Sequence, residues 1–221
     1  MAEERVEQRR LAAIMFTDMV GFSALAQRDE ALALELLEEH RTLLRHIFLK
    51  HRGHEIKTIG DGFLVEFASA VAAVNCAVEV QEALARRNVD TSADRLFQVR
   101  IGIHLGDVLL HGNDIVGDGV NIAARVEPLA DSGGIAVTQQ VFDQVYNKIP
   151  QTLVRIGNVE LKNIHRPMEV YRIVLGSKAT SVVAEQRKMS SPAGQSEIHC
   201  GAAVRKREFR TGERVSERRD Q

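Results

Sequence analysis

The sequence predicts an α/β sandwich in which helices pack against a mixed β-sheet. Three observations indicate this fold class. Short β-type runs alternate with longer amphipathic helical patterns along the chain, but without the strict regularity of parallel βαβ units. No repeat of about 20–50 residues is visible. The 221 residues are 44% hydrophobic and 27% charged, which is ordinary for a globular domain with some additional chain.

The first half of this pattern begins with a short strand. The apolar run Leu11–Phe16 suits a buried strand that ends at a Thr17-Asp18 turn. Residues 29–51 follow as a helix, because apolar side chains at 32, 36, 43 and 47 fall on one helical face. His54–Ile59 and Phe63–Phe67 then predict a β-hairpin.

The middle of the chain carries a second helix and a clear strand. Ser69 is a candidate N-cap for a helix that continues to about Arg87. Residues 88–94 are polar and predict a loop. Phe97–Leu105 alternates between apolar and other residues with a period of two, which is typical of a strand. Residues 108–110 either continue this strand or return along it.

The remaining elements are shorter. Residues 119–130 predict a helix, closed by the turn Asp131-Ser132-Gly133-Gly134. A brief strand, a small helix capped by Thr138 and two closing strands complete the pattern, at 135–137, 138–145, 153–161 and 168–174.

Composition excludes several function classes. The formal net charge is −1 and aromatic residues make up 5%, so neither a basic nor an aromatic surface for nucleic acid is expected. Cys76 and Cys200 lack metal-ligand or redox spacing, and Cys76 is expected to be a small buried residue. No run approaches the ~20 apolar residues of a membrane span, and the charged N-terminus lacks a signal-peptide pattern. A cytoplasmic setting is therefore expected.

Three segments carry the chemistry. The first is Lys57-Thr58-Ile59-Gly60-Asp61, which places a cation and a carboxylate four residues apart around the tip of the predicted hairpin. Taken alone, this segment is modest evidence for a functional site, because Asp and Gly are ordinary turn residues. The others are Phe16-Thr17-Asp18-Met19-Val20-Gly21-Phe22 and the stretch Asp114-Ile115-Val116-Gly117-Asp118-Gly119-Val120-Asn121-Ile122-Ala123-Ala124-Arg125. Neither a GxxxxGK[ST] phosphate loop nor an HExxH zinc motif is found.

Together these segments resemble the class III nucleotidyl cyclase catalytic domain, of the adenylate type, over residues 9–175. The resemblance implies a ferredoxin-like sandwich whose sheet is largely antiparallel. Residues 1–8 would then form an N-terminal segment. Residues 176–221 contain few large apolar residues and predict a mostly disordered tail, or alternatively a linker to a domain outside this chain.

Asp18 and Asp61 form the predicted metal site. Each lies where a strand meets a Gly-containing turn, and two close carboxylates are costly unless a cation neutralises them. Hard oxygen ligands suit Mg²⁺ or Mn²⁺. The alternative is that both are solvated turn residues. The resemblance implies that the pair holds two divalent cations against a nucleoside triphosphate.

Lys57 and Asp114 are the predicted base-reading pair. Lysine only donates hydrogen bonds and an ionised aspartate only accepts them, which matches the acceptor N1 and donor N6 of adenine. Guanine reverses both groups, so an enclosed site would oppose it by roughly 1–3 kcal/mol for each neutral mismatch. The alternatives are a strand lysine whose stem covers apolar surface and an ordinary loop carboxylate.

Three further residues complete the predicted site. Asn121 and Arg125 are four residues apart on a predicted helix and so share a face, which alone is common on solvated helices. The resemblance implies that Asn121 orients the ribose and Arg125 stabilises charge on the α-phosphate. It also implies a triphosphate contact for Lys162, in the segment Val159-Glu160-Leu161-Lys162-Asn163. His104 is expected to pack or hydrogen-bond, and Asp107 to sit in a turn.

The implied function is conversion of ATP to 3′,5′-cyclic AMP and pyrophosphate by two-metal-ion catalysis. The resemblance implies that the metal aspartates of one subunit meet the base-reading pair, Asn121 and Arg125 of the other, which requires a homodimer. Alternatives are a guanylate cyclase and a catalytically silent nucleotide-binding or dimerisation module. The segment 107–113 is shorter than the arm of many cyclases, which leaves the dimer geometry and the placement of Asp114 open. The regulatory input and the preference between Mg²⁺ and Mn²⁺ are also left open.

Overall fold

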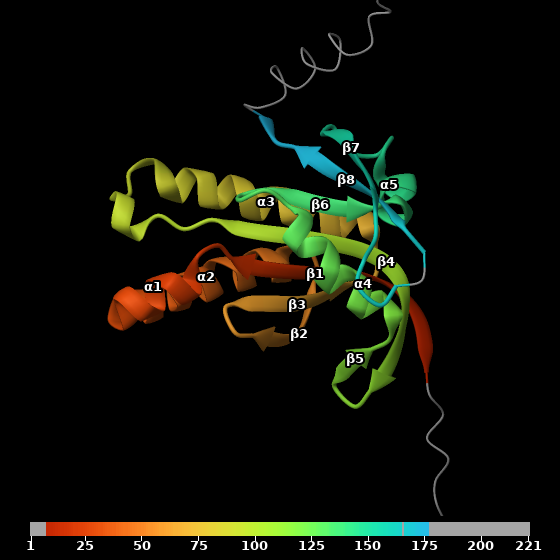
Figure 1. The fold of residues 1–221 in the computed structure, drawn as a ribbon, viewed down its shortest axis with the longest axis horizontal. Helices are drawn as coiled ribbons and strands as arrows, with labels where there is room; N and C mark the ends of the chain where they lie inside the picture. Colours follow the sequence, from red (N-terminus) through yellow and green to blue (C-terminus); the bar gives the residue numbers. More distant parts are fainter. Residues whose placement is uncertain (1–7, 165, 177–221) are drawn as a thin grey trace, which may run out of the picture.

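A computed structural model describes residues 8–164 and 166–176 of the chain. Eight strands form one sheet (Figure 1), with the order β2-β3-β1-β4-β6-β8-β7 and with β5 paired to β4. The strands are β1 (Arg9–Met19), β2 (His54–Ile59), β3 (Gly62–Phe67), β4 (Val99–His111), β5 (Asp114–Val116), β6 (Ile135–Thr138), β7 (Thr152–Val159) and β8 (Met168–Val174). Only β4 and β6 pair in parallel, so the sheet is mixed and largely antiparallel as predicted.

Five α-helices and two short 3₁₀ helices connect these strands. They are α1 (Phe22–Arg28), α2 (Glu30–Lys50), α3 (Ala70–Val89), η1 (Ala93–Arg95), α4 (Asp118–Val126), η2 (Glu127–Leu129) and α5 (Gln139–Val145). The two longest helices begin at side-chain caps: Asp29 Oδ1 accepts from Leu32 N at 3.0 Å, and Ser69 Oγ accepts from Ala72 N at 3.4 Å. None of the helices in the described ranges combines the length and the hydropathy that crossing a bilayer requires.

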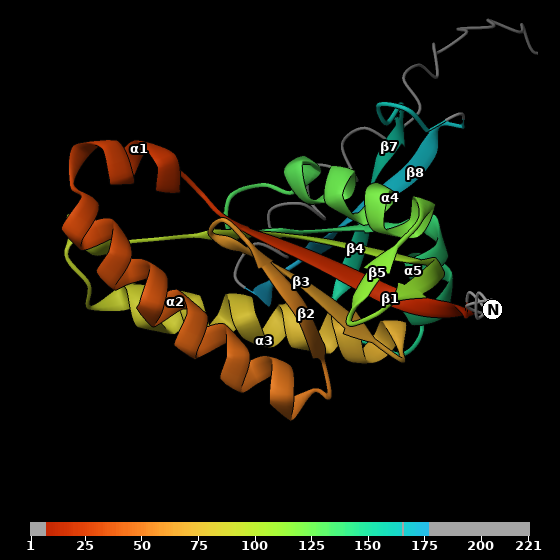
Figure 2. The same ribbon diagram turned by 90° about the horizontal axis from the view of Figure 1, so that it is seen from below.

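The first four strands and the two long helices form the ferredoxin-like unit that was predicted. Their chain order is β-α-β-β-α-β, and their spatial order in the sheet is β4-β1-β3-β2. Figure 2 shows α2 and α3 together on one side of this sheet, with α4 on the other. Strand β1 therefore lies between β3 and β4, where it pairs antiparallel with both.

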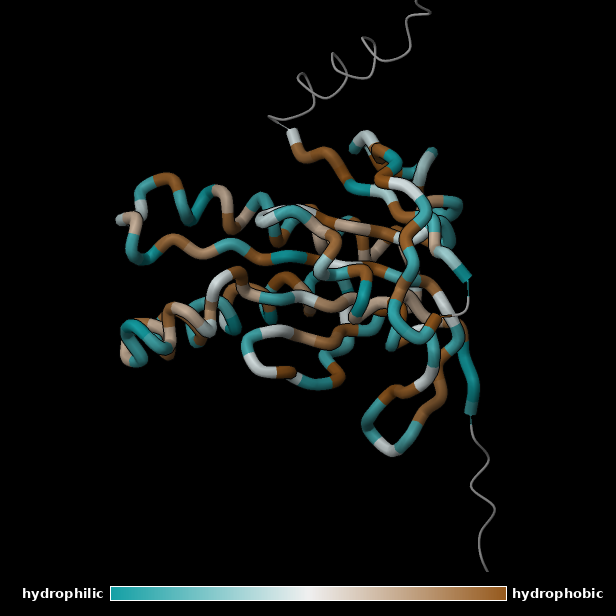
Figure 3. The backbone as a smooth tube through the Cα atoms, in the orientation of Figure 1, coloured by the Kyte–Doolittle hydropathy of each residue, from teal (hydrophilic) through white to brown (hydrophobic). Residues whose placement is uncertain are grey.

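Alternate residues of β1 face two separate cores. Ala13 and Met15 pack in the large cluster beneath α2 and α3, whereas Ala12 and Ile14 pack in the smaller cluster that includes Ala123 of α4. Both faces of the central strands are therefore covered, and hydrophobic residues concentrate along them (Figure 3). This burial fixes the register of β1, because a slip by one residue would exchange the two faces.

The first strand is longer than predicted. It continues through Thr17 and Asp18 to Met19, so the predicted Thr17-Asp18 turn is wrong. The reason is tertiary: Thr17 and Asp18 have partners on the neighbouring strand β4, which the apolar pattern of β1 alone does not reveal. Helix α1, which buries none of its residues, was not predicted either.

Two other predicted boundaries change. The helix expected over 119–130 ends at Val126 and gives way to η2, in which Pro128 has no N–H to donate to the preceding turn. Asp107 lies within β4, paired with Leu11, so its predicted turn role is wrong. Strand β4 continues through residues 108–110 and returns as β5, which settles the alternative left open above.

The remaining sequence predictions concern two buried side chains and the two ends of the chain. Cys76 is fully buried on α3, as expected. His104 is buried and its Nδ1 lies 2.9 Å from Thr138 Oγ1, which confirms a hydrogen-bonding role. The expectations for Cys200, for residues 1–7 and for the tail beyond Gly176 lie outside the described residues.

Candidate active site

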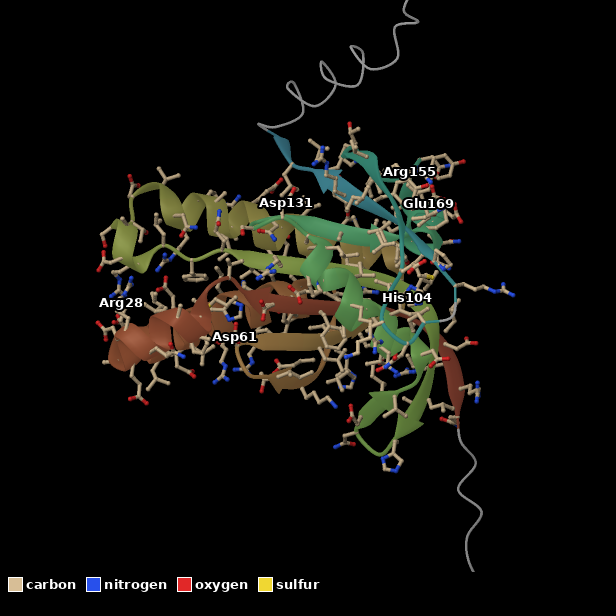
Figure 4. The ribbon with its side chains drawn as sticks, viewed as in Figure 1. Arg28, Asp61, His104, Asp131, Arg155 and Glu169 are labelled. Atoms are coloured by element: carbon tan, nitrogen blue, oxygen red, sulfur yellow. The ribbon has the colours of Figure 1, made fainter. Side chains whose placement is uncertain are left out.

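Asp18 and Asp61 are brought together by the pairing of β1 with β3. Asp61 lies in the turn between β2 and β3 (Figure 4), and its Oδ2 accepts a hydrogen bond of 3.0 Å from the backbone N–H of Met19, the residue after Asp18. The Asp61 carboxylate is therefore fastened to the end of β1. This is the proximity that the sequence predicted for the two aspartates.

A second contact holds the hairpin to β1. The hydroxyl oxygen of Thr17 accepts a hydrogen bond of 3.0 Å from the buried N–H of Phe63. At Gly62 the two backbones approach so closely that a Cβ would lie 2.0 Å from the carbonyl oxygen of Thr17. Glycine is therefore required at this position for steric reasons. The turn carrying Asp61 cannot move from Asp18 without breaking these contacts.

The electrostatics of Asp18 fit a cation site. Desolvation and the nearby charge of Asp61 raise the pKa of Asp18, and Arg100 partly offsets this by lowering it. Two neighbouring carboxylates form a hard-oxygen donor set for which a divalent cation is the natural counterion. Among the described residues, no group of three or more His, Cys, Asp or Glu gathers as a fuller ligand set. Bound phosphate and water would have to supply the remaining ligands.

Sequence reasoning missed two charged residues beside this pair. Arg100 is the cross-strand partner of Asp18 in the β1–β4 ladder, and its Nη2 lies 3.7 Å from Asp18 Oδ2. Glu127 begins η2, and its Oε1 lies 3.7 Å from Arg100 Nε. Desolvation, followed by the charges of Asp18 and Asp61, raises the pKa of Glu127 to about 7. The signal available in the sequence was a charged residue among apolar neighbours: Arg100 in the alternating run Phe97–Leu105, and Glu127 in the helix predicted over 119–130.

Lys57 and Asp114 form a direct ion pair. Lys57 Nζ donates to Asp114 Oδ2 at 2.6 Å, although the two residues are 57 positions apart. Asp114 Oδ1 also accepts from the N–H of Ile115 at 2.8 Å. The hydrogen bond from Lys57 is the main reason why the pKa of Asp114 is lowered. The short β4–β5 hairpin thus places Asp114 within reach of β2.

A β-bulge in β2 orients the lysine. The register shifts between Glu55 and Lys57, so that Lys57 lies opposite Leu64 rather than opposite Phe63. Leu64 belongs to the core cluster on the α4 side of the sheet, whereas Phe63 belongs to the cluster beneath α2 and α3. The bulge therefore turns Lys57 toward the side of the sheet that carries α4.

Asn121 and Arg125 lie one turn apart on α4, as predicted. Arg125 Nη1 donates to the carbonyl oxygen of Asn121 at 3.1 Å, and Asn121 is exposed. Lys162 is exposed in the turn between β7 and β8. Its neighbour Leu161 packs in the same cluster as Val126 of α4, which fixes this turn beside the helix.

The predicted residues therefore form separate groups within one chain. Within residues 8–164 and 166–176, neither hydrogen bonds nor ion pairs join the Asp18–Asp61 pair to the Lys57–Asp114 pair, to Asn121, to Arg125 or to Lys162. The carboxylate pair lies at the end of β1 and in the β2–β3 turn, whereas the Lys57–Asp114 ion pair bridges β2 and β5. Within the described chain, these groups are therefore joined by no direct contact of their own.

Comparison with known proteins identifies the family. The sequence profile of the adenylate and guanylate cyclase catalytic domain matches residues 4–175, more than three quarters of the chain. The chain belongs to this family. Its fold is accordingly that of a class III nucleotidyl cyclase catalytic domain.

Individual relatives agree with this assignment. The chain is 43% identical over 172 residues to adenylate cyclase 3 of Rhizobium meliloti (strain 1021), an assignment that the protein's name marks as provisional. The match covers 77% of this chain and 29% of that relative, so the chain spans less than a third of the relative's length. A second relative, the serine/threonine-protein kinase pkn2 of Myxococcus xanthus, is 30% identical over 161 residues and is covered to 19%.

Solved structures give the same result in three dimensions. An adenylate/guanylate cyclase/hydrolase from Silicibacter pomeroyi superimposes with a TM-score of 0.72 at 38% identity, covering 76% of this chain and 99% of that one. The adenylyl cyclase CyaB from P. aeruginosa superimposes with a TM-score of 0.67 at 25% identity, covering 77% and 97%. Almost the whole of each solved cyclase chain therefore has a counterpart in the described part of this fold.

Proposed function

We propose that this chain is an adenylate cyclase that converts ATP to 3′,5′-cyclic AMP and pyrophosphate. The observation that carries the proposal is the Lys57–Asp114 ion pair, with its nitrogen and oxygen 2.6 Å apart. One donor on β2 beside one acceptor on β5 is complementary to N1 and N6 of adenine and opposed to guanine. The name of the Rhizobium relative points in the same direction.

Asp18 and Asp61 are proposed to hold two divalent cations, Mg²⁺ or Mn²⁺. Their converging carboxylates, and the raised pKa of Asp18, support this assignment. When bound, such ions would acidify the 3′-hydroxyl of the substrate and neutralise its phosphate charge. The chain itself holds the Asp61 carboxylate through the Met19 N–H, and it holds the β2–β3 hairpin to β1 through the Thr17 hydroxyl and the Phe63 N–H.

The remaining residues are proposed to position the substrate. Lys57 and Asp114 would read adenine, Asn121 would orient the ribose, and Arg125 would donate to the α-phosphate. Lys162 would contact the triphosphate. The 3′-hydroxyl then loses its proton to water, and its oxygen forms a bond to the α-phosphorus while the bond from that phosphorus to the pyrophosphate oxygen breaks. Catalysis is mainly positioning and charge stabilisation, as in other phosphoryl transfers.

Two copies of the chain are proposed to share each active site. The arrangement is supported by the lack of a direct hydrogen bond or ion pair between the carboxylate pair and the Lys57–Asp114 pair within the described chain. In a symmetric homodimer, the carboxylates of one subunit would face the base-reading pair, the asparagine and the arginine of its partner. Two equivalent sites would result.

The decisive experiment measures nucleotide turnover by the purified chain. ATP or GTP is supplied with Mn²⁺, and cyclic nucleotide and pyrophosphate are quantified together with the mass of the protein in solution. Cyclic AMP from a dimer is expected. Production of cyclic GMP would instead identify a guanylate cyclase, and nucleotide binding without turnover would identify a silent module.

A mixing experiment tests the shared site. Asp61→Ala and Arg125→Ala chains are each expected to be inactive as homodimers. Mixing them should restore activity, because one of the two sites in each heterodimer would then be intact. Absence of any recovery in mixtures that demonstrably contain heterodimers would reject the shared-site arrangement.

A further inference from the structure

Arg100 lies between two carboxylates beside the proposed metal site. Its Nη2 is 3.7 Å from Asp18 Oδ2, and its Nε is 3.7 Å from Glu127 Oε1. Neither distance is short enough for a hydrogen bond. Elsewhere in the same fold an arginine between elements is fully engaged: Arg87 donates to both oxygens of Glu39 at 2.9 Å. Arg100 is therefore attracted by both acids without being locked to either.

The inner half of this arrangement is buried and has no hydrogen-bond partner. Arg100 Nε and Glu127 Oε1 are both inaccessible, and within the described chain neither makes a hydrogen bond. The side chain of Glu127 is only 11% exposed, whereas that of Asp18 is 41% exposed. Glu127 consequently attracts the guanidinium inward, and Asp18 attracts it toward the proposed metal site.

The backbone fixes the position of Glu127 against β4. A Cβ on Gly102 would lie 2.2 Å from the backbone nitrogen of Glu127, so η2 lies directly on the strand two residues beyond Arg100. Pro128 in η2 further restricts the backbone. The Glu127 carboxylate can therefore oppose Asp18 from a rigid site.

We propose that Glu127 is a positioning residue that keeps Arg100 from closing on Asp18 and so leaves the Asp18 carboxylate available to divalent cations. This inference rests on the proposed metal site of Asp18 and Asp61. If Glu127 loses its charge, Asp18 is the one acid that remains paired with Arg100 within residues 8–164 and 166–176. The guanidinium would then close its present 3.7 Å separation from Asp18 Oδ2 to hydrogen-bond distance and compete with the cation.

The test measures Mn²⁺ binding to the purified full chain by electron paramagnetic resonance, with and without pyrophosphate. Glu127→Gln is expected to weaken Mn²⁺ binding about 10-fold, the lower end of the usual effect of groups that orient metal ligands. In an Arg100→Gln background the same substitution should have little effect, because the competing cation has been removed. Arg100→Gln alone should bind Mn²⁺ at least as tightly as the unmodified chain.

The matched control is Glu66→Gln. Glu66 is also a buried acid on a central strand with an arginine partner, Arg10, at 2.6 Å, and it has no assigned role in the site. This control should leave Mn²⁺ binding unchanged. Thermal unfolding of each variant separates loss of the site from loss of the fold, and Arg100→Gln tests the inference even if Glu127→Gln does not fold.

The outcomes are distinct. If the unmodified chain binds no Mn²⁺ with pyrophosphate present, the metal site itself is wrong and this inference falls with it. If the unmodified chain binds Mn²⁺ and Glu127→Gln binds equally well, only the positioning role is overturned. If the losses caused by Glu127→Gln and Arg100→Gln multiply in the double variant, both residues are merely structural and the role is again overturned.

Discussion

The two polar pairs of this domain differ in how they are held. Asp18 and Asp61 carry like charges and lie near each other because the Met19 N–H donates to Asp61 and the Thr17 hydroxyl accepts from the Phe63 N–H, which holds the β2–β3 hairpin to β1. Lys57 and Asp114 carry opposite charges and hold each other directly at 2.6 Å. The first pair is electrostatically unfavourable until a cation arrives, whereas the second already satisfies itself.

This difference indicates how each pair should respond to its ligand. Like charges held by a rigid frame form a site that gains free energy on binding a cation, since repulsion is relieved. An exposed ion pair is worth at most about 1 kcal/mol, so a purine base can separate it at little cost. The side chains of Lys57 and Asp114 are 44% and 37% exposed, in agreement with such an exchange.

The largest expected effect comes from removing one charge of the Asp18–Asp61 pair. Asp61→Asn keeps the shape of the side chain and removes one of the two charges. ATP turnover should fall by about 1,000-fold or more, because a bound metal contributes several kcal/mol to stabilising the transition state. The stabilisation of the fold by Mn²⁺, measured as a rise in Tm, should disappear as well. Retention of that rise would show that Asp61 does not hold the cation.

The same variant should be no less stable than the unmodified chain when metal is absent. Removing one carboxylate relieves the repulsion that raises the pKa of Asp18. The free energy of unfolding in the presence of a chelator, measured by urea titration, tests this point. A clear loss of stability would contradict the view that the pair is held against its own repulsion.

The next effect concerns the buried side chains that pack beneath the Asp61 turn. His40 of α2 is fully buried, with its ring centroid 5.5 Å from that of Phe63, which follows the Asp61 turn. Burial, reinforced by Arg41 and Arg45, lowers the pKa of His40 to about 4. The unfolded chain binds this proton near pH 6.5 and the folded chain does not, so stability is full above pH 6.5 and falls as the pH drops toward 4.

His40→Phe should remove this part of the acid sensitivity. Each pKa unit corresponds to about 1.4 kcal/mol. Between pH 6.5 and 4, the unmodified chain should therefore lose roughly 3 kcal/mol more of its free energy of unfolding than His40→Phe. Comparing the two proteins is essential, because Glu127, whose pKa is raised to about 7, acts in the opposite direction in both. Urea titrations at several pH values provide the measurement. Parallel pH profiles would contradict the assignment.

The smallest expected effect comes from exchanging the donor and the acceptor of the Lys57–Asp114 pair. The double variant Lys57→Glu, Asp114→Ser replaces the donor by an acceptor and the acceptor by a group that can donate. Turnover of ATP should fall by about 10–100-fold, and the ratio of GTP to ATP turnover should rise, since guanine presents the complementary pattern. Lys162→Met is the control and should weaken both nucleotides alike. An unchanged nucleotide ratio would exclude Lys57 and Asp114 as the base-reading pair.

The amino-acid sequence by itself determined most of the architecture and the proximity of Asp18 and Asp61. Period-two runs and capped amphipathic segments are local signals, and they located the β2–β3 hairpin, the Ser69 cap and the central strand β4. The short motifs around Asp18 and Asp61 were informative because each motif is contiguous. Their meeting then followed from the pairing of adjacent strands.

Tertiary structure decided what depends on partners distant in sequence. Strand β1 continues through Asp18 because β4 pairs with it, and that same register places Arg100 opposite Asp18. The bulge in β2 turns Lys57 toward the α4 side of the sheet. The sequence pattern of this strand does not reveal the extra residue that forms the bulge. The place of Glu127 depends on the close approach of η2 to Gly102. Local sequence encodes propensity, but these positions are set by register and packing between segments far apart in the chain.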